Sequence, residues 1–338
     1  VGRAEAVTFS SAQLAGFARE AGFDLAGFAR AEAIPPSTLN DWLAQGFHAD
    51  MDWLAARAEE RLDVAKLYPG ARTVMALACN YWHSDDASVV ARYAQGRDYH
   101  ATMKDRLRTL RRFLRERLNT DRCYATVDVN PVMEKVWAVR AGLGTITNNG
   151  CLATPQFGSY VVLAVLILPE EVDAYATPLD EDVCGTCTLC LDACPTKAIV
   201  SPRVVDARAC LSYQTIENAG AVPEALRPAL TDQLFGCDLC QDVCPLNQAP
   251  VKAGARFEPR PLSKLSALQL AGMTRAQYDE WIPGSPLARA GFDGLRRNAA
   301  YVLGATKCAE AREVLQQLKD DPSERVRDAA NWALSRLG

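Results

Sequence analysis

The chain has 338 residues, of which 49% are hydrophobic, and a formal net charge of −4 at pH 7. This length suits two or three domains with a sizeable core, and the weak negative charge excludes a polycationic nucleic-acid binder. No run reaches the roughly 18 apolar residues of a membrane span. The 12 cysteines, without a signal peptide, indicate metal ligation in a reducing cytoplasm rather than disulfides.

The first half of the chain mixes predicted helices and strands. Helices are predicted from Ser10 or Ser11 through Ala18, then at 39–45, around 51–54 and 57–61, at 100–119 and at 131–139. Strands are predicted at 23–28, 73–79, 123–128 and 160–168. Because the order follows no strict βαβ repeat, we expect an α+β fold. The absence of a G-x-G-x-x-G or Walker sequence argues against a nicotinamide or nucleoside-triphosphate site.

The predicted helix 100–119 is strongly basic on one side. Its basic residues, opposed only by Asp105 and Glu116, are Lys104, Arg106, Arg108, Arg111, Arg112, Arg115 and Arg117. Leucines at helical spacing give it a buried face. A basic helix face is normally just solvated, but in an acidic protein it also suits contact with phosphates. Both interpretations stay open.

Cysteines of the second half form two runs. Residues 184–195 read C-x2-C-x2-C-x3-C-P, which is the run that holds [4Fe–4S] clusters in two-cluster ferredoxins. In the second run, 237–245, the first cysteine is missing and Cys210 can replace it. The fourth cysteine of such a run ligates the other cluster. We therefore expect cluster 1 on Cys184, Cys187, Cys190 and Cys244, and cluster 2 on Cys194, Cys210, Cys237 and Cys240. Zinc is the alternative, but its sites usually come as paired C-x2-C knuckles or include histidine.

The C-terminal part is helical and alanine-rich after Pro261. Its sequence Arg297-Asn-Ala-Ala300 recurs as Arg327-Asp-Ala-Ala330, and two helices per unit of this length resemble HEAT-like repeats. We expect three domains: an α+β domain at 1–177, a ferredoxin-like two-cluster module at 178–250 and a HEAT-like helical domain at 251–338.

The chain resembles epoxyqueuosine reductase, a cobalamin-dependent iron–sulfur oxidoreductase of queuosine-tRNA synthesis. The resemblance covers nearly the whole chain and rests on the eight cysteines with their displaced member, together with Gly96-Arg-Asp-Tyr-His100, Val127-Asp128, Arg140-Ala-Gly-Leu-Gly144 and Cys210-Leu-Ser-Tyr213. It implies reduction of the epoxide of epoxyqueuosine to the alkene of queuosine in the tRNA anticodon loop. It also implies cobalamin, as cob(II)alamin, two [4Fe–4S] clusters, an external electron donor, and a monomer that contacts no membrane. For tRNA as the partner, we expect the helix from Lys104 to Arg117 to contact phosphates, together with the C-terminal residues Arg296, Arg297, Arg325 and Arg327.

The resemblance also assigns site residues. Asp128 is similar to the proton donor, and Tyr99, His100 and Lys135 to substrate-pocket residues. Residues that fall where the family contacts cobalamin are Arg61, Ala91, Asp128, Met133, Asn149, Leu152, Leu163, Ser212, Cys237 and Asp238. A general acid at this position needs a raised pKa, which a partly buried site would provide.

These residues could also have purely structural roles. Asp128 stands three residues before Pro131 and could simply cap a helix. His100 could be a helix-start histidine and Tyr99 a half-buried aromatic residue. Thr145 and Asn148 depart from the family pattern, which leaves the cobalamin contacts near them open.

Two alternative functions remain from the sequence alone. The first is an electron-transfer module whose N-terminal domain only docks a partner. The second is a reductive dehalogenase, which would share cobalamin and two clusters but usually carries an export signal.

Overall fold

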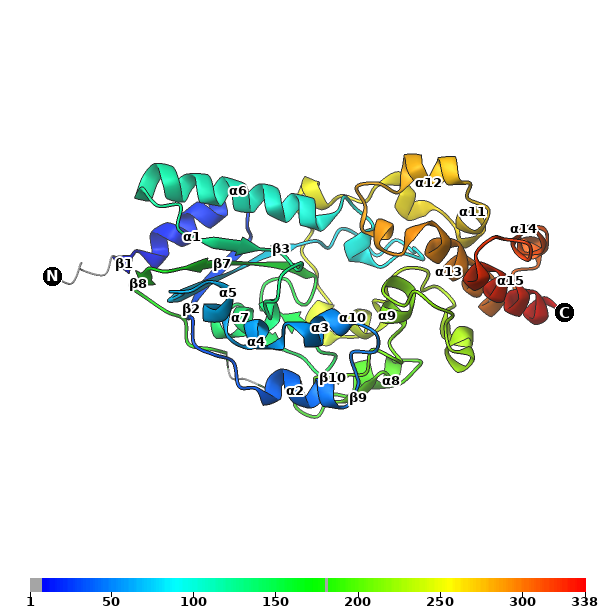
Figure 1. Ribbon diagram of the computed structural model, residues 1–338, viewed down its shortest axis with the longest axis horizontal. Helices are drawn as coiled ribbons and strands as arrows, with labels where there is room; N and C mark the ends of the chain where they lie inside the picture. Colours follow the sequence, from blue (N-terminus) through cyan, green and yellow to red (C-terminus); the bar gives the residue numbers. More distant parts are fainter. Residues whose placement is uncertain (1–7, 180–181) are drawn as a thin grey trace.

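A computed structural model describes residues 8–179 and 182–338 (Figure 1). The helices of the first half are α1 (Ser11–Glu20), α2 (Ser37–Ala44), α3 (Asp52–Ala56), α4 (Ala58–Leu62), α5 (Val64–Leu67), α6 (Tyr99–Leu118) and α7 (Glu134–Arg140). Its strands are β1 (Thr8–Phe9), β2 (Leu25–Arg30), β3 (Thr73–Asn80), β4 (Tyr124–Thr126), β5 (Thr145–Ile146), β6 (Leu152–Ala153), β7 (Val161–Leu168) and β8 (Glu171–Val172).

A four-stranded antiparallel sheet in the order β2-β3-β7-β4 forms the centre of this half. Helices cover both of its faces, with α1 and α6 on one side and α7 on the other (Figure 1). Side chains of β3 alternate between the two cores: Met75, Leu77 and Cys79 pack with α1 and α6, and Val74, Ala76 and Ala78 pack with α7. Burial on both faces explains why β3 and β7 read as continuous apolar runs. The mixed α/β character expected from the sequence is confirmed.

Most predicted elements form within a few residues of their predicted bounds, but the helix after Pro131 does not. Residues 127–133 make a turn, and α7 begins only at Glu134. Met133 stands at its N-cap position without a side-chain capping bond. Asp128 therefore does not cap this helix, and the capping interpretation was wrong.

The second half is built from short elements around the cysteines, followed by longer helices. It contains α8 (Leu189–Ala193), β9 (Ile199–Ser201), β10 (Val204–Val205), α9 (Leu211–Ile216), α10 (Leu239–Asp242), α11 (Ala267–Ala271), α12 (Arg275–Trp281), α13 (Gly291–Ala305), α14 (Arg312–Leu318) and α15 (Glu324–Leu337). The two copies of the Arg-Asn/Asp-Ala-Ala sequence lie on α13 and α15. These helices pack so closely that a Cβ at Gly304 would lie 2.6 Å from the Ala333 Cα.

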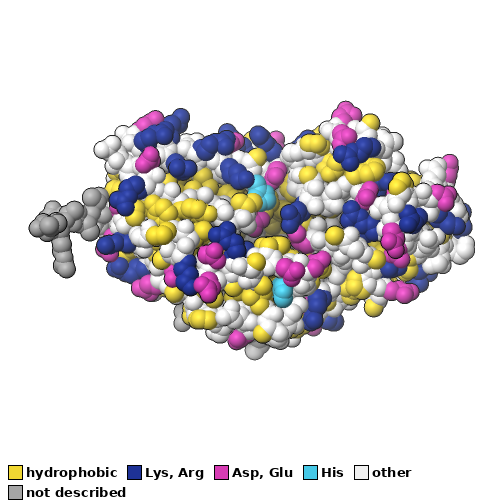
Figure 2. Space-filling view, viewed as in Figure 1, with side chains coloured by type: hydrophobic (Ala, Val, Ile, Leu, Met, Phe, Trp, Pro, Cys, Tyr) yellow, Lys and Arg dark blue, Asp and Glu magenta, His cyan; other side chains and the backbone are white. Residues whose placement is uncertain are grey.

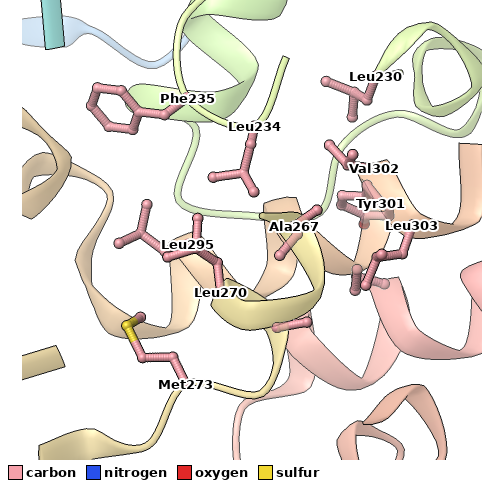
Figure 3. Packing of buried hydrophobic residues seen from close by; sticks show 14 of the residues in the cluster. Leu230, Leu234, Phe235, Ala267, Leu270, Met273, Leu295, Tyr301, Val302 and Leu303 are labelled. Atoms are coloured by element: carbon pink, nitrogen blue, oxygen red, sulfur yellow. The ribbon is translucent and has the colours of Figure 1, made fainter. Parts of the chain in front are cut away.

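The C-terminal helices share one hydrophobic core with the cysteine-rich part. Figure 3 shows Leu234 and Phe235, which directly precede Gly236 and Cys237, beside Leu270 and Leu295. Burial of such side chains contributes about 1.5–3 kcal/mol each. The helices therefore support the chain segment that carries the second cysteine run.

Two buried polar residues of α13 hold neighbouring backbone. Arg297, which is 1% exposed, donates to the Gln214 carbonyl at 2.8 Å and to the Asn218 carbonyl at 2.6 Å. Asn298 Nδ2 donates to the Thr215 carbonyl at 2.8 Å and the Leu234 carbonyl at 2.9 Å. From the sequence we expected Arg297 to contact tRNA phosphates. This was wrong, because its guanidinium satisfies buried carbonyls.

Other arginines expected to contact RNA are also engaged within the protein. Arg296 pairs with Asp321 at 2.6 Å, and Arg325 donates to the Ala219 carbonyl at 3.0 Å. Arg327 donates to the Asp321 carbonyl at 2.7 Å. The C-terminal arginines thus serve mainly to hold helix ends and loops. Within 8–179 and 182–338, no helix is long and apolar enough to cross a membrane.

We predict that Asn298→Ala destabilises the protein by about 2–4 kcal/mol, because two buried carbonyls lose their donor. A thermal melt followed by circular dichroism, and by cluster absorbance, should show the loss. Asn331→Ala, on the exposed face of α15, is the matched control and should melt like the unaltered protein. Equal melting of both variants would contradict the assigned role of Asn298.

Candidate active site and cluster sites

The four cysteines predicted for cluster 1 lie around one cavity. A space of about 70 Å³ is lined by Cys184, Cys187, Cys190 and Cys244, with Thr147, Asn148 and Asn149 on another side. Cys244 comes from the second run, so the exchange of the fourth cysteine predicted from spacing agrees with the geometry. Four thiols around one small cavity fit a [4Fe–4S] cluster.

The four cysteines predicted for cluster 2 also lie close together. The pKa of the Cys237 thiol is raised to about 12, first by burial and then by the nearby Cys210 and Cys194. Burial raises the pKa of the Cys240 thiol as well, and the nearby Cys151, Cys237 and Cys210 add to this shift. These mutual effects indicate that Cys194, Cys210 and Cys240 lie near Cys237, and metal binding would deprotonate the four thiols.

A short turn before β6 contacts both cysteine groups. The Asn148 backbone amide donates to Cys184 Sγ at 3.3 Å, and its side chain donates to the Cys187 carbonyl at 3.0 Å. Asn149 Nδ2 donates to the Cys240 carbonyl at 3.0 Å. Asn148, which departs from the family pattern, is thus a structural contact of the first cysteine run, and Asn149 holds the second.

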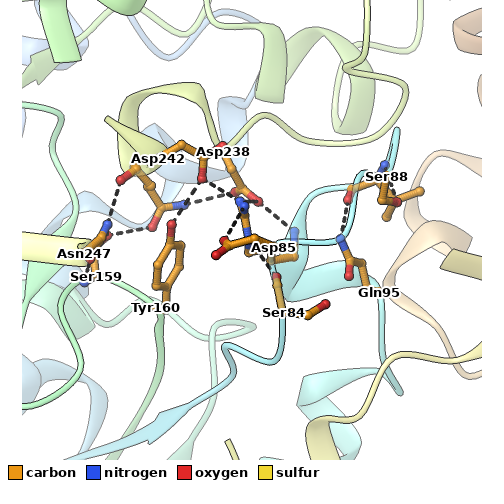
Figure 4. A network of polar contacts seen from close by, with 12 residues as sticks. Ser84, Asp85, Ser88, Gln95, Ser159, Tyr160, Asp238, Asp242 and Asn247 are labelled. Atoms are coloured by element: carbon orange, nitrogen blue, oxygen red, sulfur yellow. Dashed lines mark hydrogen bonds and ion pairs between the residues drawn. The ribbon is translucent and has the colours of Figure 1, made fainter. Parts of the chain in front are cut away.

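A polar network joins the N-terminal half of the chain to the second cysteine run (Figure 4). The Arg92 backbone amide donates to Asp238 at 2.7 Å, and its guanidinium pairs with Asp242 at 2.5 Å. Tyr160 donates to the same Asp242 carboxylate at 3.1 Å. Because Asp238 and Asp242 flank Cys240, this network fixes the cysteine loop against the loops that precede α6 and β7.

Three cavities meet at Asp128. The large cavity, about 1050 Å³, runs along α7 and is lined by Trp53 and Met133 among others. The cleft, about 910 Å³, lies between the start of α6 and the C-terminal part, and the small cavity, about 320 Å³, lies toward Cys151. Asp128 lines all three. Figure 2 shows this face of the molecule hollowed near its middle.

Asp128 receives hydrogen bonds from the start of α6. Its Oδ2 accepts from the Tyr99 hydroxyl and lies 3.4 Å from His100 Nε2. The other ring nitrogen of His100, Nδ1, lies 2.9 Å from the Asp98 carboxylate, which also caps α6 by accepting the His100 amide. The side chain of Asp128 remains 60% exposed, so its carboxylate is available from the cavities.

The protonation states of Asp128 and His100 differ from what the sequence led us to expect. Hydrogen bonding by His100, aided by Tyr99 and opposed by burial, lowers the pKa of Asp128. Burial alone would lower the pKa of His100, but its bonds to Asp128 and Asp98 outweigh this and raise it to about 9. The raised pKa expected for Asp128 was therefore wrong. At neutral pH the pair is an aspartate beside an imidazolium, and the proton resides on His100.

A second carboxyl group, Glu134, lies next to Asp128. Its Oε1 accepts the Asp128 backbone amide at 3.0 Å. Burial and the nearby Asp128 charge raise the pKa of Glu134 to about 7, although hydrogen bonds and Arg61 oppose the shift. Asp128 itself has a φ of 57°, a left-handed conformation that costs a non-glycine residue about 1–2 kcal/mol.

Besides Asp128, eight of the residues predicted from the resemblance lie around these three cavities. They are Arg61, Tyr99, His100, Met133, Lys135, Leu152, Leu163 and Ser212. Ala91, Cys237 and Asp238 instead line a separate cavity of about 480 Å³. Asn149 lines the cluster 1 cavity. The predicted cofactor contacts thus fall into one large group and two smaller ones.

Arg61 is a candidate contact for a polar ligand. It is 8% exposed, it lies over Trp53 at 5.4 Å, and its Nε has no hydrogen-bond partner among the described residues. A buried, unpaired donor is costly unless a ligand satisfies it. A cofactor with amide and phosphate oxygens, such as cobalamin, suits this position.

Sequence reasoning missed Glu134, Asp98 and the pair Arg289–Glu217. Asp98 could have been recognised as the N-cap before Tyr99, and Glu134 as an acid within an apolar stretch. Arg289 reaches the cleft from the C-terminal part and binds Glu217 at 2.6 Å. No local signal linked these two residues, because they are 72 positions apart.

Comparison with known proteins gives the family. Residues 61–129 match the family described as Epoxyqueuosine reductase QueG, DUF1730, and residues 183–247 match a 4Fe-4S double cluster binding domain. The epoxyqueuosine reductase of Gloeobacter violaceus is 40% identical over 88% of this chain and 97% of its own length. That of Pseudomonas aeruginosa is 38% identical, over 95% and 92%.

The chain belongs to the epoxyqueuosine reductase family. Solved structures agree with this assignment. A crystal structure of epoxyqueuosine reductase with an epoxyqueuosine-modified tRNA-Tyr stem loop superposes with a TM-score of 0.88 at 30% identity, over 97% of this chain and 90% of that one. The Streptococcus thermophilus enzyme has a TM-score of 0.86 at 26% identity, over 96% and 90%. The family makes the chain an oxidoreductase of queuosine synthesis with a double [4Fe–4S] domain.

We predict that the protein, purified anaerobically, holds about eight iron atoms per chain. Cys194→Ala should lose about half of the iron, because one ligand of cluster 2 is removed. Cys151→Ala is the control, since this cysteine neighbours both ligand groups but belongs to neither. Iron analysis would refute the ligand set if Cys151→Ala lost a cluster and Cys194→Ala kept both, or if zinc replaced iron.

Proposed function

We propose that this chain reduces epoxyqueuosine to queuosine in tRNA by delivering electrons and protons at the junction of the three cavities. The observation that carries the proposal is that Cys210, a proposed ligand of cluster 2, lines the same cleft as Asp128, Tyr99 and His100. An electron source and an acid–base group thus share one cleft. A carrier that merely docked a partner would not need this group, and the tRNA stem loop bound by a similar solved enzyme also favours the reductase.

The overall reaction sets what the site must supply. Both C–O bonds of the epoxide break, a C=C bond forms, and the oxygen leaves as water, so two electrons and two protons are consumed. The clusters transfer electrons one at a time from an external donor. Cobalamin, when bound, supplies a strongly nucleophilic cobalt for the opening of the strained ring. The large cavity and the unpaired Arg61 Nε support its binding.

The protein's part is to hold a proton beside the substrate oxygen. Asp128 and His100 share one proton, which rests on the imidazole in the free protein. Negative charge on the opening epoxide oxygen would draw this proton through the Asp128 carboxyl to the oxygen. A positioned acid of this kind contributes roughly 10²–10⁴ in rate. Tyr99 orients the same carboxylate by donating to Oδ2, the oxygen that His100 also faces.

Exposed cations of α6 support RNA binding. Lys104, Arg108, Arg111, Arg112 and Arg115 are exposed along this helix, and Lys and Arg side chains gather over α6 in Figure 2. Arg106 is different, because it is half-buried against Cys79 and Phe257. We infer that the exposed row binds tRNA phosphates while the anticodon nucleoside enters the cleft.

The proposal also covers the location of the protein, its electron donor and its domain arrangement. We infer a cytoplasmic monomer that receives electrons from a separate one-electron donor. The C-terminal helices would form a HEAT-like unit within a third domain at 251–338, after the α+β domain at 1–177 and the cluster module at 178–250.

We predict that Asp128→Asn lowers turnover of epoxyqueuosine-containing tRNA by roughly 10²–10⁴. Asparagine keeps the shape of the side chain but cannot carry the proton. Iron content and cobalamin binding should be unchanged, and single-turnover assays with the loaded enzyme would measure the chemical step. Full turnover by this variant would exclude Asp128 from proton transfer and leave His100 and Tyr99.

We predict that neutralising Arg108, Arg111 and Arg115 together, each to Gln, weakens tRNA binding and flattens its salt dependence. Each lost phosphate contact should reduce the logarithmic slope by roughly one unit. Filter binding between low and moderate salt would measure it. The control replaces Arg19, Lys66 and Arg72, which are exposed elsewhere, and removes the same charge. If both triple variants keep the same slope as the unaltered protein, α6 is only a solvated face.

A further inference from the structure

The turn that carries Asp128 is short and unusually shaped. It follows the edge strand β4, and Asp128 adopts a φ of 57°. Val129 is 63% exposed, so the outer side of this turn has little packing to support it. A left-handed aspartate at the end of an edge strand needs a specific contact to keep its conformation.

Glu134 provides this contact from across the turn. Its Oε1 accepts the Asp128 backbone amide at 3.0 Å, six residues back in the chain. The side chain lies between the large and the small cavity and lines both. Glu134 thus binds the backbone of Asp128, while Tyr99 and His100 bind its carboxylate.

We propose that Glu134 is a positioning residue that fixes the Asp128 turn and so directs the Asp128 carboxylate to the junction of the cavities. The inference rests on the role of Asp128 proposed above. Glu134 touches the backbone of Asp128 and acts through it, and it transfers no proton in this scheme.

The chemistry of the contact explains why a long acid suits the position. Glutamate begins α7 and reaches back over the whole turn, which an aspartate, shorter by one methylene, could not do without moving the helix. A carboxyl group offers an acceptor oxygen whether or not it is protonated. The contact therefore persists as Glu134 titrates between Arg61 and Asp128. Glutamine offers the same oxygen at the same reach, whereas alanine offers none.

The experiment compares Glu134→Ala with Glu134→Gln in the holoenzyme. Amide hydrogen exchange, read by mass spectrometry over residues 127–131, is the first measurement and does not depend on activity. We expect exchange in Glu134→Ala to rise about tenfold, the worth of one ordinary hydrogen bond, and to stay near the unaltered level in Glu134→Gln. Glu170→Ala and Glu170→Gln are matched controls, because burial also raises the pKa of that carboxyl but it lies at the far end of β7.

Turnover provides the second measurement through a double-mutant cycle. Glu134→Ala should lower kcat by roughly 10- to 100-fold with little change in KM, since a small misplacement of a reacting group has an effect of this size. In an Asp128→Asn background the same substitution should cost less than about twofold. Glu134→Gln should restore most of the rate.

The outcomes separate this inference from the proposed function. Unchanged exchange at 127–131 in Glu134→Ala overturns the inference, as does a loss of kcat that is fully additive with Asp128→Asn. If exchange rises but Asp128→Asn turns over normally, Glu134 holds the turn and the catalytic role of Asp128 is what fails. A low melting temperature in Glu134→Ala but not in Glu134→Gln, with exchange raised equally over the whole chain, would also refute a local positioning role.

Discussion

The exchange of one cysteine between the two runs is the constraint on which the second half of the fold depends. Cys244 must return to the cavity of Cys184, Cys187 and Cys190, and Cys194 must reach the group that includes Cys210. The intervening chain has to loop out and back, with few long elements of its own. Its backbone carbonyls are satisfied instead by Arg297 and Asn298, so the C-terminal helices complete the cluster module.

The antiparallel sheet is the corresponding constraint for the first half of the fold. Because β3 and β7 are buried on both faces, they cannot carry polar catalytic groups. The polar groups proposed for catalysis lie instead where the sheet ends, in the turn after the edge strand β4 and at the start of α6. Asp98 caps α6 and at the same time binds His100. One capping residue therefore orders the helix and fixes the imidazole that faces Asp128.

The sequence predicted those parts in which one local rule governs the outcome. The cysteine spacing predicted that Cys244 lies with Cys184, Cys187 and Cys190 around one cavity, and continuous apolar runs predicted β3 and β7. The prediction failed where contacts between residues far apart in the sequence determine the structure. Arg297 looked like a surface cation, but it binds carbonyls of α9 and of the loop that follows it. The start of α7 was also misplaced, for a local reason: Pro131 is a good first helical residue, but residues 127–133 form a turn in which Glu134 accepts the Asp128 amide.

The largest difference between the prediction and the structure concerns the protonation state of Asp128, the predicted proton donor. A carboxyl group alone in an apolar pocket would hold its own proton near neutral pH. Asp128 is not alone, since His100 and Tyr99 both donate to it and lower its pKa. In the proposed mechanism the proton is therefore held by His100, whose pKa is raised by its bonds to Asp128 and Asp98. Such an arrangement keeps the exposed carboxylate ready to accept a hydrogen bond from incoming substrate, while the proton stays in reserve until charge develops on the oxygen.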